Sequence, residues 1–227
     1  MLNQKTHETH LRRLLSSIYL SRDLQNILAF KGGTSLYMFY NLDRFSTDLD
    51  FNCLTENLGV ETLNKIFQDY HIQDYYNKRN TWFWLLSYQK AQMKIKVEVS
   101  KRDYPDTYET KDLLGIPIKV MTKECMFAHK LCAITDRSKL QNRDLYDTLF
   151  MLKNNFEIKQ EIIKLRTGNT LKEYLEHLIE FIPKNIKTNH ILDGLGEVLT
   201  ENQKDWAKSQ LLPLLLMEIQ NRLREIS

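Results

Sequence analysis

The chain has 227 residues, of which 42% are hydrophobic and 27% charged, enough apolar content to bury a core and to exclude an intrinsically disordered chain. Its net charge of +3 permits a polyanionic partner such as nucleic acid without requiring one. No stretch approaches the roughly 18 apolar residues of a membrane span, the N-terminus lacks a signal-peptide core, and the 3 cysteines lack zinc-ligand spacing, so we expect a cytoplasmic protein with reduced thiols.

The first half of the chain mixes helical and strand-like segments. Apolar and polar residues alternate with period two over residues 93–100, which is typical of a strand with one buried face. The patterns predict helices over residues 7–22, 34–40 and 60–70, and strands over residues 27–30, 48–53, 81–88, 93–100 and 116–120. Together these elements predict an α+β fold in which helices flank a small mixed β-sheet.

The second half is dominated by Leu, Ile, Lys and Glu at helical spacing. The spacing predicts helices over residues 122–136, 142–153, 157–166, 170–181 and 203–225. Because the composition changes near Met121, we expect two domains, an α/β core over residues 1–121 and a C-terminal helical bundle over residues 122–227.

Two aspartates, Asp48 and Asp50, alternate with Leu49 and Phe51. Residues two apart on a strand point to the same face, so both carboxylates project together while the apolar pair enters the core. Clustered carboxylate oxygens suit Mg²⁺ or Mn²⁺, and Glu98 on the polar face of the 93–100 strand could complete such a metal site. Taken alone, the same residues are compatible with a solvated strand face.

A glycine pair, Gly32 and Gly33, follows a predicted strand and leads into a helix that begins with Thr34 and Ser35. Backbone N–H groups at a helix N-terminus, together with hydroxyl groups, favour phosphate binding. A tight structural turn is the alternative for the glycines alone. Phosphate and metal ligands on one short segment are what nucleotidyl transfer requires.

A second polar group comes from the predicted helices on either side of residue 139. Lys130 lies on one helix, and Asp144 and Asp147 share a face of the next because they are three residues apart. Arg137, Lys139 and Arg143 make the connection between them basic, so it could meet phosphate groups. A surface salt-bridge pattern is the alternative.

A cluster of aromatic residues over positions 75–84 leaves two possibilities open. Its members are Tyr75, Tyr76, Trp82, Phe83 and Trp84. Such a cluster is typical of packing in a core or on an edge strand, and stacking of nucleic-acid bases is the alternative. The histidines show no H-x-x-x-H pair and no nucleophile elbow is present, so nothing favours protease or hydrolase chemistry.

Five segments in order along the chain resemble the type IV toxin nucleotidyltransferases, the AbiEii/AbiGii toxins of abortive-infection and toxin–antitoxin systems, within the polymerase-beta-like superfamily. They are KGGTSL, RFSTDLDF, KVEVS, RDLYD with the preceding Lys130, and LGEVLTENQKDW, and they span residues 31–206. The resemblance implies a nucleotidyltransferase-type α/β core followed by a helical domain that contributes to the active-site cleft.

The resemblance also implies roles for individual residues. Gly32, Gly33 and Thr34 would bind nucleotide phosphate. Ser46, Asp48 and Asp50 would lie at the catalytic centre, with metal held by Asp48, Asp50 and Glu98. Lys130 would contact the triphosphate, and Asp144 corresponds to the catalytic aspartate of the helical R-D-x-x-D motif.

An enzyme of this kind would need Mg²⁺ or Mn²⁺ and use a nucleoside triphosphate as substrate. Its partners would be an RNA acceptor, the 3′ end of tRNA in some members, and a cognate antitoxin encoded nearby. Blocking translation in this way would serve phage defence. Two alternatives remain open, which are transfer to a protein side chain and a non-catalytic nucleotide-binding module.

Overall fold

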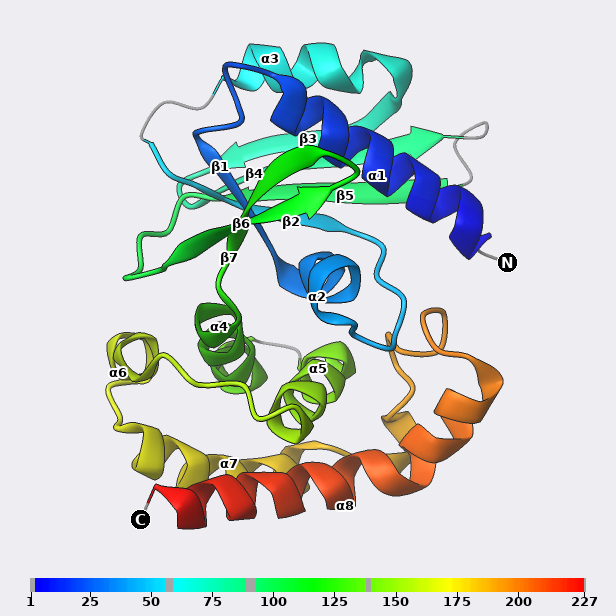
Figure 1. The fold of residues 1–227 in the computed structure, drawn as a ribbon. Helices are drawn as coiled ribbons and strands as arrows, with labels where there is room; N and C mark the ends of the chain where they lie inside the picture. Colours follow the sequence, from blue (N-terminus) through cyan, green and yellow to red (C-terminus); the bar gives the residue numbers. More distant parts are fainter. Residues whose placement is uncertain (1–2, 56–58, 89–92, 138–139, 227) are drawn as a thin grey trace. The chain divides into compact units, whose positions relative to one another are not determined.

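The computed structural model describes residues 3–55, 59–88, 93–137 and 140–226. The chain forms two compact units, Met1–Thr122 and Lys123–Ser227 (Figure 1). Among the described residues, no helix combines the length and the apolar composition needed to cross a bilayer.

The first unit is built on a seven-stranded sheet with the order β3-β4-β5-β2-β1-β7-β6 (Figure 1). The strands are β1 (Leu28–Lys31), β2 (Leu49–Cys53), β3 (His71–Lys78), β4 (Thr81–Tyr88), β5 (Met93–Ser100), β6 (Tyr108–Leu113) and β7 (Ile116–Met121). β2 runs parallel to β5, and β1 parallel to β7, whereas the other neighbours are antiparallel. The predicted mixed sheet is therefore confirmed.

The sheet has more strands than the patterns predicted, because β3 and β6 were missed. Both are the outermost strands of the sheet and hairpin partners of predicted strands. Most residues of β3 are exposed, so this strand lacks the alternation of apolar and polar residues that reveals a strand with one buried face. Edge strands depend on pairing with a neighbour, which a local pattern does not record.

Three α-helices belong to this unit, which are α1 (Gln4–Leu20), α2 (Gly32–Tyr40) and α3 (Val60–Ile66), and a 3-10 turn, Phe67–Asp69, follows α3. α1 buries one stripe of residues at helical spacing, namely Leu11, Leu14, Leu15 and Ile18. Its first turn is capped by Asn3, whose side chain accepts a hydrogen bond from the Thr6 N–H. Packing of this apolar stripe therefore stabilises α1 in the fold.

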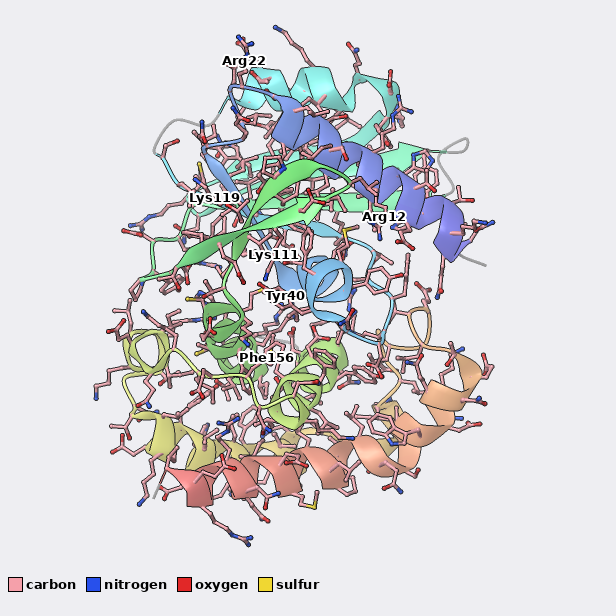
Figure 2. All side chains as sticks on the ribbon, viewed as in Figure 1. Arg12, Arg22, Tyr40, Lys111, Lys119 and Phe156 are labelled. Carbon is pink, nitrogen blue, oxygen red and sulfur yellow. The ribbon has the colours of Figure 1, made fainter. Side chains whose placement is uncertain are left out.

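The C-terminal end of α2 is anchored to the edge of the sheet at β6. Tyr40 donates a hydrogen bond to Glu109, and the Lys111 ammonium lies 5.0 Å from the centre of the Tyr40 ring (Figure 2). Lys111 also pairs with Glu109 at 2.9 Å. Because α2 begins at the glycine pair, these contacts help to orient the helix that carries it.

Strands β4 and β5 have one buried and one accessible face. Trp82, Trp84, Val97 and Val99 are buried on the first face, and the alternation over residues 93–100 predicted this for the two valines. On the other face Phe83 and Glu98 are half-buried. The accessible face is where the carboxylates of the candidate site lie.

The second unit is helical. It contains α4 (Lys123–Asp136), α5 (Asn142–Lys153), α6 (Gln160–Thr167), α7 (Leu171–Asn185), a 3-10 helix (Thr188–His190) and α8 (Glu201–Glu225). Capping boxes at Thr170 with Glu173 and at Thr200 with Gln203 define where α7 and α8 begin. All five predicted helices are present, with ends shifted by a few residues.

Candidate active site

The glycine pair packs directly against one of the predicted metal ligands. Gly32 is the first residue of α2 and has a φ of +81°, a conformation that L side chains rarely adopt. A Cβ atom at this position would collide with Oδ2 of Asp50. Glycine is therefore required both by the backbone conformation and by the carboxylate that lies beside it.

Gly33 lies against the loop that precedes β2. An added Cβ atom would lie 2.8 Å from Nη2 of Arg44 and 2.9 Å from the Ser46 hydroxyl, which is closer than real Cβ atoms come. Arg44 is buried, and its Nη1 donates to the Phe45 carbonyl over 2.9 Å. The absence of a side chain at Gly33 thus allows the loop to approach the start of the helix.

Thr34 ties the same loop to α2. The hydroxyls of Thr34 and Ser46 are hydrogen-bonded at 2.9 Å, and Thr34 also donates to the carbonyl of Asp48. Thr34 is fully buried, so in this structure its hydroxyl positions the loop. The predicted phosphate contact of Thr34 and the catalytic role of Ser46 stay predictions.

The carboxylates lie on the accessible face of the sheet. Asp50 of β2 and Glu98 of β5 lie opposite each other in the parallel pairing, so their side chains share a face. Asp48 immediately precedes β2 and is half-buried, like Asp50, whereas Leu49 is fully buried. The predicted alternation of carboxylate and apolar side chains is confirmed.

Within the described parts of the chain, no group of three or more His, Cys, Asp or Glu residues is arranged to hold a metal ion. The carboxylate oxygens of Asp48, Asp50 and Glu98 suit a hard cation such as Mg²⁺ in their chemistry. Their predicted metal role therefore rests on donor type and strand position.

Lys31 joins this cluster, although the sequence did not single it out. It lies opposite Asp50 in the antiparallel pairing of β1 and β2. Burial lowers the pKa of Lys31, and the carboxylates of Asp50, Asp106 and Glu98 oppose this effect by favouring the charged ammonium. The only hint in the sequence was its place directly before the glycine pair.

A buried histidine, His7 of α1, holds the residue before Asp48. The Thr47 carbonyl can only accept, so Nε2 of His7 donates to it over 2.9 Å, and Nδ1 accepts from the Tyr88 hydroxyl over 2.6 Å. His7 is 1% exposed. No local pattern indicated this contact, because His7 and Thr47 are 40 positions apart in the chain.

Replacing His7 with Gln should reduce the acid sensitivity of the fold. Burial lowers the pKa of His7 below its usual 6.5, so on acidification the unfolded chain takes up a proton that the folded chain resists. Folding stability therefore falls as the pH drops below 6.5. A Gln amide can still donate to Thr47 but does not titrate, so we expect the variant to lose less stability than wild type on acidification.

Urea unfolding of wild type and His7→Gln at neutral and acidic pH measures this difference. His71→Gln serves as the control, because His71 is an exposed histidine in the same unit. An equal acid-induced loss of stability in wild type and His7→Gln would show that the buried imidazole contributes nothing.

The second polar group is entirely in the helical unit. Nζ of Lys130 on α4 lies 2.8 Å from a carboxylate oxygen of Asp144 and 2.8 Å from one of Asp147, both on α5. Nε of Arg137 lies 3.2 Å from the second oxygen of Asp144. The side chains of Asp144 and Asp147 are 3% and 0% exposed, so the alternative of a solvated surface salt bridge is wrong.

The basic connection predicted between these helices is only partly described. Arg137 contacts Asp144, and Arg143 is half-buried on α5. Lys139 lies outside the described residues. The contact of Arg137 with a carboxylate shows that at least one of these cations balances the acidic pair, and its predicted role toward phosphate stays a prediction.

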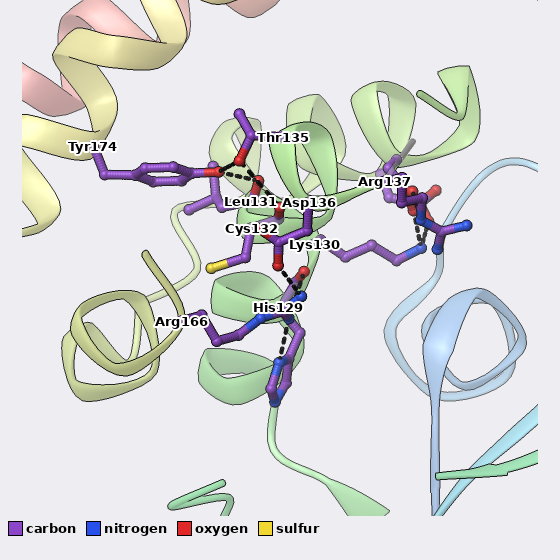
Figure 3. Close-up of polar contacts among 11 residues, drawn as sticks. His129, Lys130, Leu131, Cys132, Thr135, Asp136, Arg137, Arg166 and Tyr174 are labelled. Atoms are coloured by element: carbon purple, nitrogen blue, oxygen red, sulfur yellow. Dashed lines mark hydrogen bonds and ion pairs between the residues drawn. The ribbon is translucent and has the colours of Figure 1, made fainter. Parts of the chain in front are cut away.

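Polar contacts from α6 and α7 stabilise the position of α4, the helix that carries Lys130. Arg166 of α6 lies 2.6 Å from a carboxylate oxygen of Asp136 and donates to Nδ1 of His129 over 2.7 Å (Figure 3). Tyr174 of α7 donates to the Leu131 carbonyl over 2.9 Å. These contacts flank Lys130 in the chain and limit its freedom to leave the acidic pair.

Solved structures share this fold. A candidate nucleotidyltransferase from H. pylori is 22% identical, with a TM-score of 0.63 over 100% of this chain and 99% of that chain. JHP933 from Helicobacter pylori is 20% identical, with a TM-score of 0.58 over 100% and 97% of the two chains. An antigenic nucleotidyltransferase-like protein from Paracoccidioides brasiliensis is 16% identical, with a TM-score of 0.52 over 82% and 93%.

The family is shown by a different comparison. No protein with a curated description matches the chain at a significant level. The family model described as the nucleotidyl transferase AbiEii toxin of type IV toxin–antitoxin systems matches residues 13–212, which include both polar groups described above. This chain therefore belongs to the AbiEii nucleotidyltransferase toxin family and is a nucleotidyltransferase.

Proposed function

We propose that this nucleotidyltransferase transfers a nucleotide from a nucleoside triphosphate to the 3′ end of an RNA such as tRNA, in a metal-dependent reaction that blocks translation. The observation that carries the proposal is the packing of Gly32 against Asp50. It joins a helix start suited to phosphate with a carboxylate suited to a divalent cation. Nucleotidyl transfer needs these two functions side by side.

The residues of the first unit would act mainly by binding and positioning. Backbone N–H groups at the start of α2 would hold phosphate oxygens of the triphosphate. Asp48, Asp50 and Glu98 would hold Mg²⁺ or Mn²⁺, and the ion would supply positive charge to the phosphates. The hydrogen bonds of Thr34 and His7 to the backbone of residues 47 and 48 would keep the Asp48 carboxylate in place.

In the second unit, Lys130 would contact the triphosphate. Its side chain is 15% exposed, so part of it remains accessible. Asp144 and Asp147 fix the direction of the ammonium through contacts of 2.8 Å each. Asp144 would thus act as a positioning residue for Lys130, and its proposed action near the acceptor is a further part of the hypothesis.

Asp48→Asn should abolish transfer while the protein stays folded. The amide keeps the size of the side chain but loses the charge that binds the cation, so we expect at least about a hundredfold slower transfer. The assay incubates purified protein with each α-labelled nucleoside triphosphate, Mg²⁺ and total tRNA, followed by separation of RNA from protein on denaturing gels.

Asp43→Asn is the matched control, because Asp43 is an exposed aspartate in the same loop. It should transfer at the wild-type rate. Undiminished transfer by Asp48→Asn would remove Asp48 from the mechanism. Label on protein instead of RNA would contradict the proposed acceptor, and the absence of any labelled product would favour a binding module.

Growth arrest on expression, relieved by the cognate antitoxin that this toxin family implies, would connect the reaction with toxicity. Asp48→Asn should not arrest growth. Equal arrest by the variant would separate toxicity from nucleotide transfer.

A further inference from the structure

One row of side chains crosses five strands of the sheet. Lys31, Asp50, Glu98, Phe83 and Tyr76 lie opposite one another in turn on β1, β2, β5, β4 and β3. Residues directly opposite on neighbouring strands point to the same side of a sheet. The carboxylates of the candidate site therefore continue, on one face, into a pair of aromatic rings.

The two rings at the end of this row are stacked. The ring centres of Tyr76 and Phe83 are 4.6 Å apart, and the ring planes differ by 8°. Both side chains are half-buried, whereas the neighbouring Trp82 and Trp84 point to the opposite face and are buried. The stacked pair thus does not belong to the core beneath the sheet.

Charges of both signs lie near the stacked pair. Burial raises the pKa of Tyr76, and the nearby carboxylates of Glu98 and Asp74 add to this effect. The Lys78 ammonium lies 4.4 Å from the centre of the Tyr76 ring. Lys94 and Lys96 are exposed on β5 and alternate with buried residues, so they share the face of Glu98. Aromatic rings bordered by lysines bind single-stranded nucleic acid by stacking its bases and attracting its phosphates. A protein acceptor would not need this combination.

The position of the pair in the row indicates which substrate it would meet. In phosphoryl transfer the attacking and leaving oxygens lie on opposite sides of the reacting phosphorus. Gly32, which begins the helix suited to phosphate, follows Lys31 at one end of the row, and the carboxylates of Asp50 and Glu98 lie between it and Phe83. The aromatic pair is consequently on the side from which the acceptor approaches.

We infer that Tyr76 and Phe83 form the stacking site for the terminal base of a single-stranded RNA acceptor. A cross-strand aromatic pair also stabilises a hairpin, but that role needs neither the lysines nor the alignment with the carboxylates. The inference rests on the proposed function, because it takes the acceptor to be RNA. Stacking on these rings would bring the terminal ribose hydroxyl toward Glu98.

Binding of a fluorescein-labelled RNA hairpin with a single-stranded 3′ end tests this site without turnover. Fluorescence anisotropy is measured with no nucleoside triphosphate present. Phe83→Leu and Tyr76→Leu should each weaken binding about fivefold or more, the lower end of the effect of losing a stacking ring. Tyr75→Leu is the matched control, because Tyr75 is on β3 but points to the opposite face and is 43% exposed.

Phe83→Trp keeps the test decisive should a leucine variant fail to fold, since a larger ring should bind at least as tightly as wild type. Equal binding by wild type and both leucine variants, an equal loss in Tyr75→Leu, or a loss in Phe83→Trp would each overturn the inference. So would failure of the wild-type protein to bind the hairpin.

A transfer assay on the same variants separates this inference from the proposed function. If wild type labels RNA, we expect the leucine variants to raise KM for RNA and to leave KM for the triphosphate unchanged. Wild-type transfer to RNA with unaltered KM values in the variants would reject the stacking site and leave the function standing. Absence of transfer by wild type would reject the proposed function. The binding data would still show whether Tyr76 and Phe83 contribute to RNA binding.

Discussion

Lys130→Met should destabilise the helical unit by about 3–5 kcal/mol, which is the usual cost of removing one partner of a buried ion pair. Lys130 lies 2.8 Å from both Asp144 and Asp147, whose side chains are 3% and 0% exposed. Methionine is similar in length but carries no charge, so the two buried carboxylates would lose the ammonium that contacts both of them, while Arg137 would still contact Asp144. Urea unfolding followed by circular dichroism measures the change.

Two further variants show whether the cause is charge. Lys130→Arg keeps a cation and should lose much less stability than Lys130→Met. Adding Asp144→Asn and Asp147→Asn to Lys130→Met should recover part of the loss, because neutral amides are cheaper to bury than carboxylates. If Lys130→Met were as stable as wild type, the ammonium would have no structural role and its contacts would reflect only catalytic positioning.

Gly32→Ala should reduce nucleotide transfer by at least about a hundredfold, because a Cβ atom at this position collides with Oδ2 of Asp50. Either the carboxylate or the start of α2 must move to relieve this collision. The φ of +81° adds a backbone cost of about 1–2 kcal/mol for any L residue. Transfer rates and unfolding free energies of the same preparations separate these two effects.

Gly115→Ala provides a matched control for the backbone cost. Gly115 has a φ of +84°, but a Cβ atom there has no neighbour within 4 Å. We expect both variants to lose stability by comparable amounts, and only Gly32→Ala to lose transfer. Equal activity of the two variants would show that the close approach of Gly32 to Asp50 is not needed for the reaction.

Local sequence patterns were sufficient to predict the helices and strands that bury one face. The alternation in β5 and the helical spacing in α1, α5 and α8 come from burial of every second, or every third and fourth, residue, which leaves a record in the sequence. The order of the five segments from KGGTSL to LGEVLTENQKDW was likewise sufficient to indicate the family that the family model shows. These properties depend on residues near one another in the chain.

Contacts between residues far apart in the sequence could be found only from the tertiary structure. The row from Lys31 to Tyr76 exists because strand register brings five strands together, and no local pattern encodes the partner of an edge strand such as β3. The hydrogen bond from His7 to Thr47 depends on where α1 packs. Lys130 is a half-buried bridge between two carboxylates rather than a solvated lysine because α4 and α5 pack together, and burial is a property of packing that residue type alone does not determine.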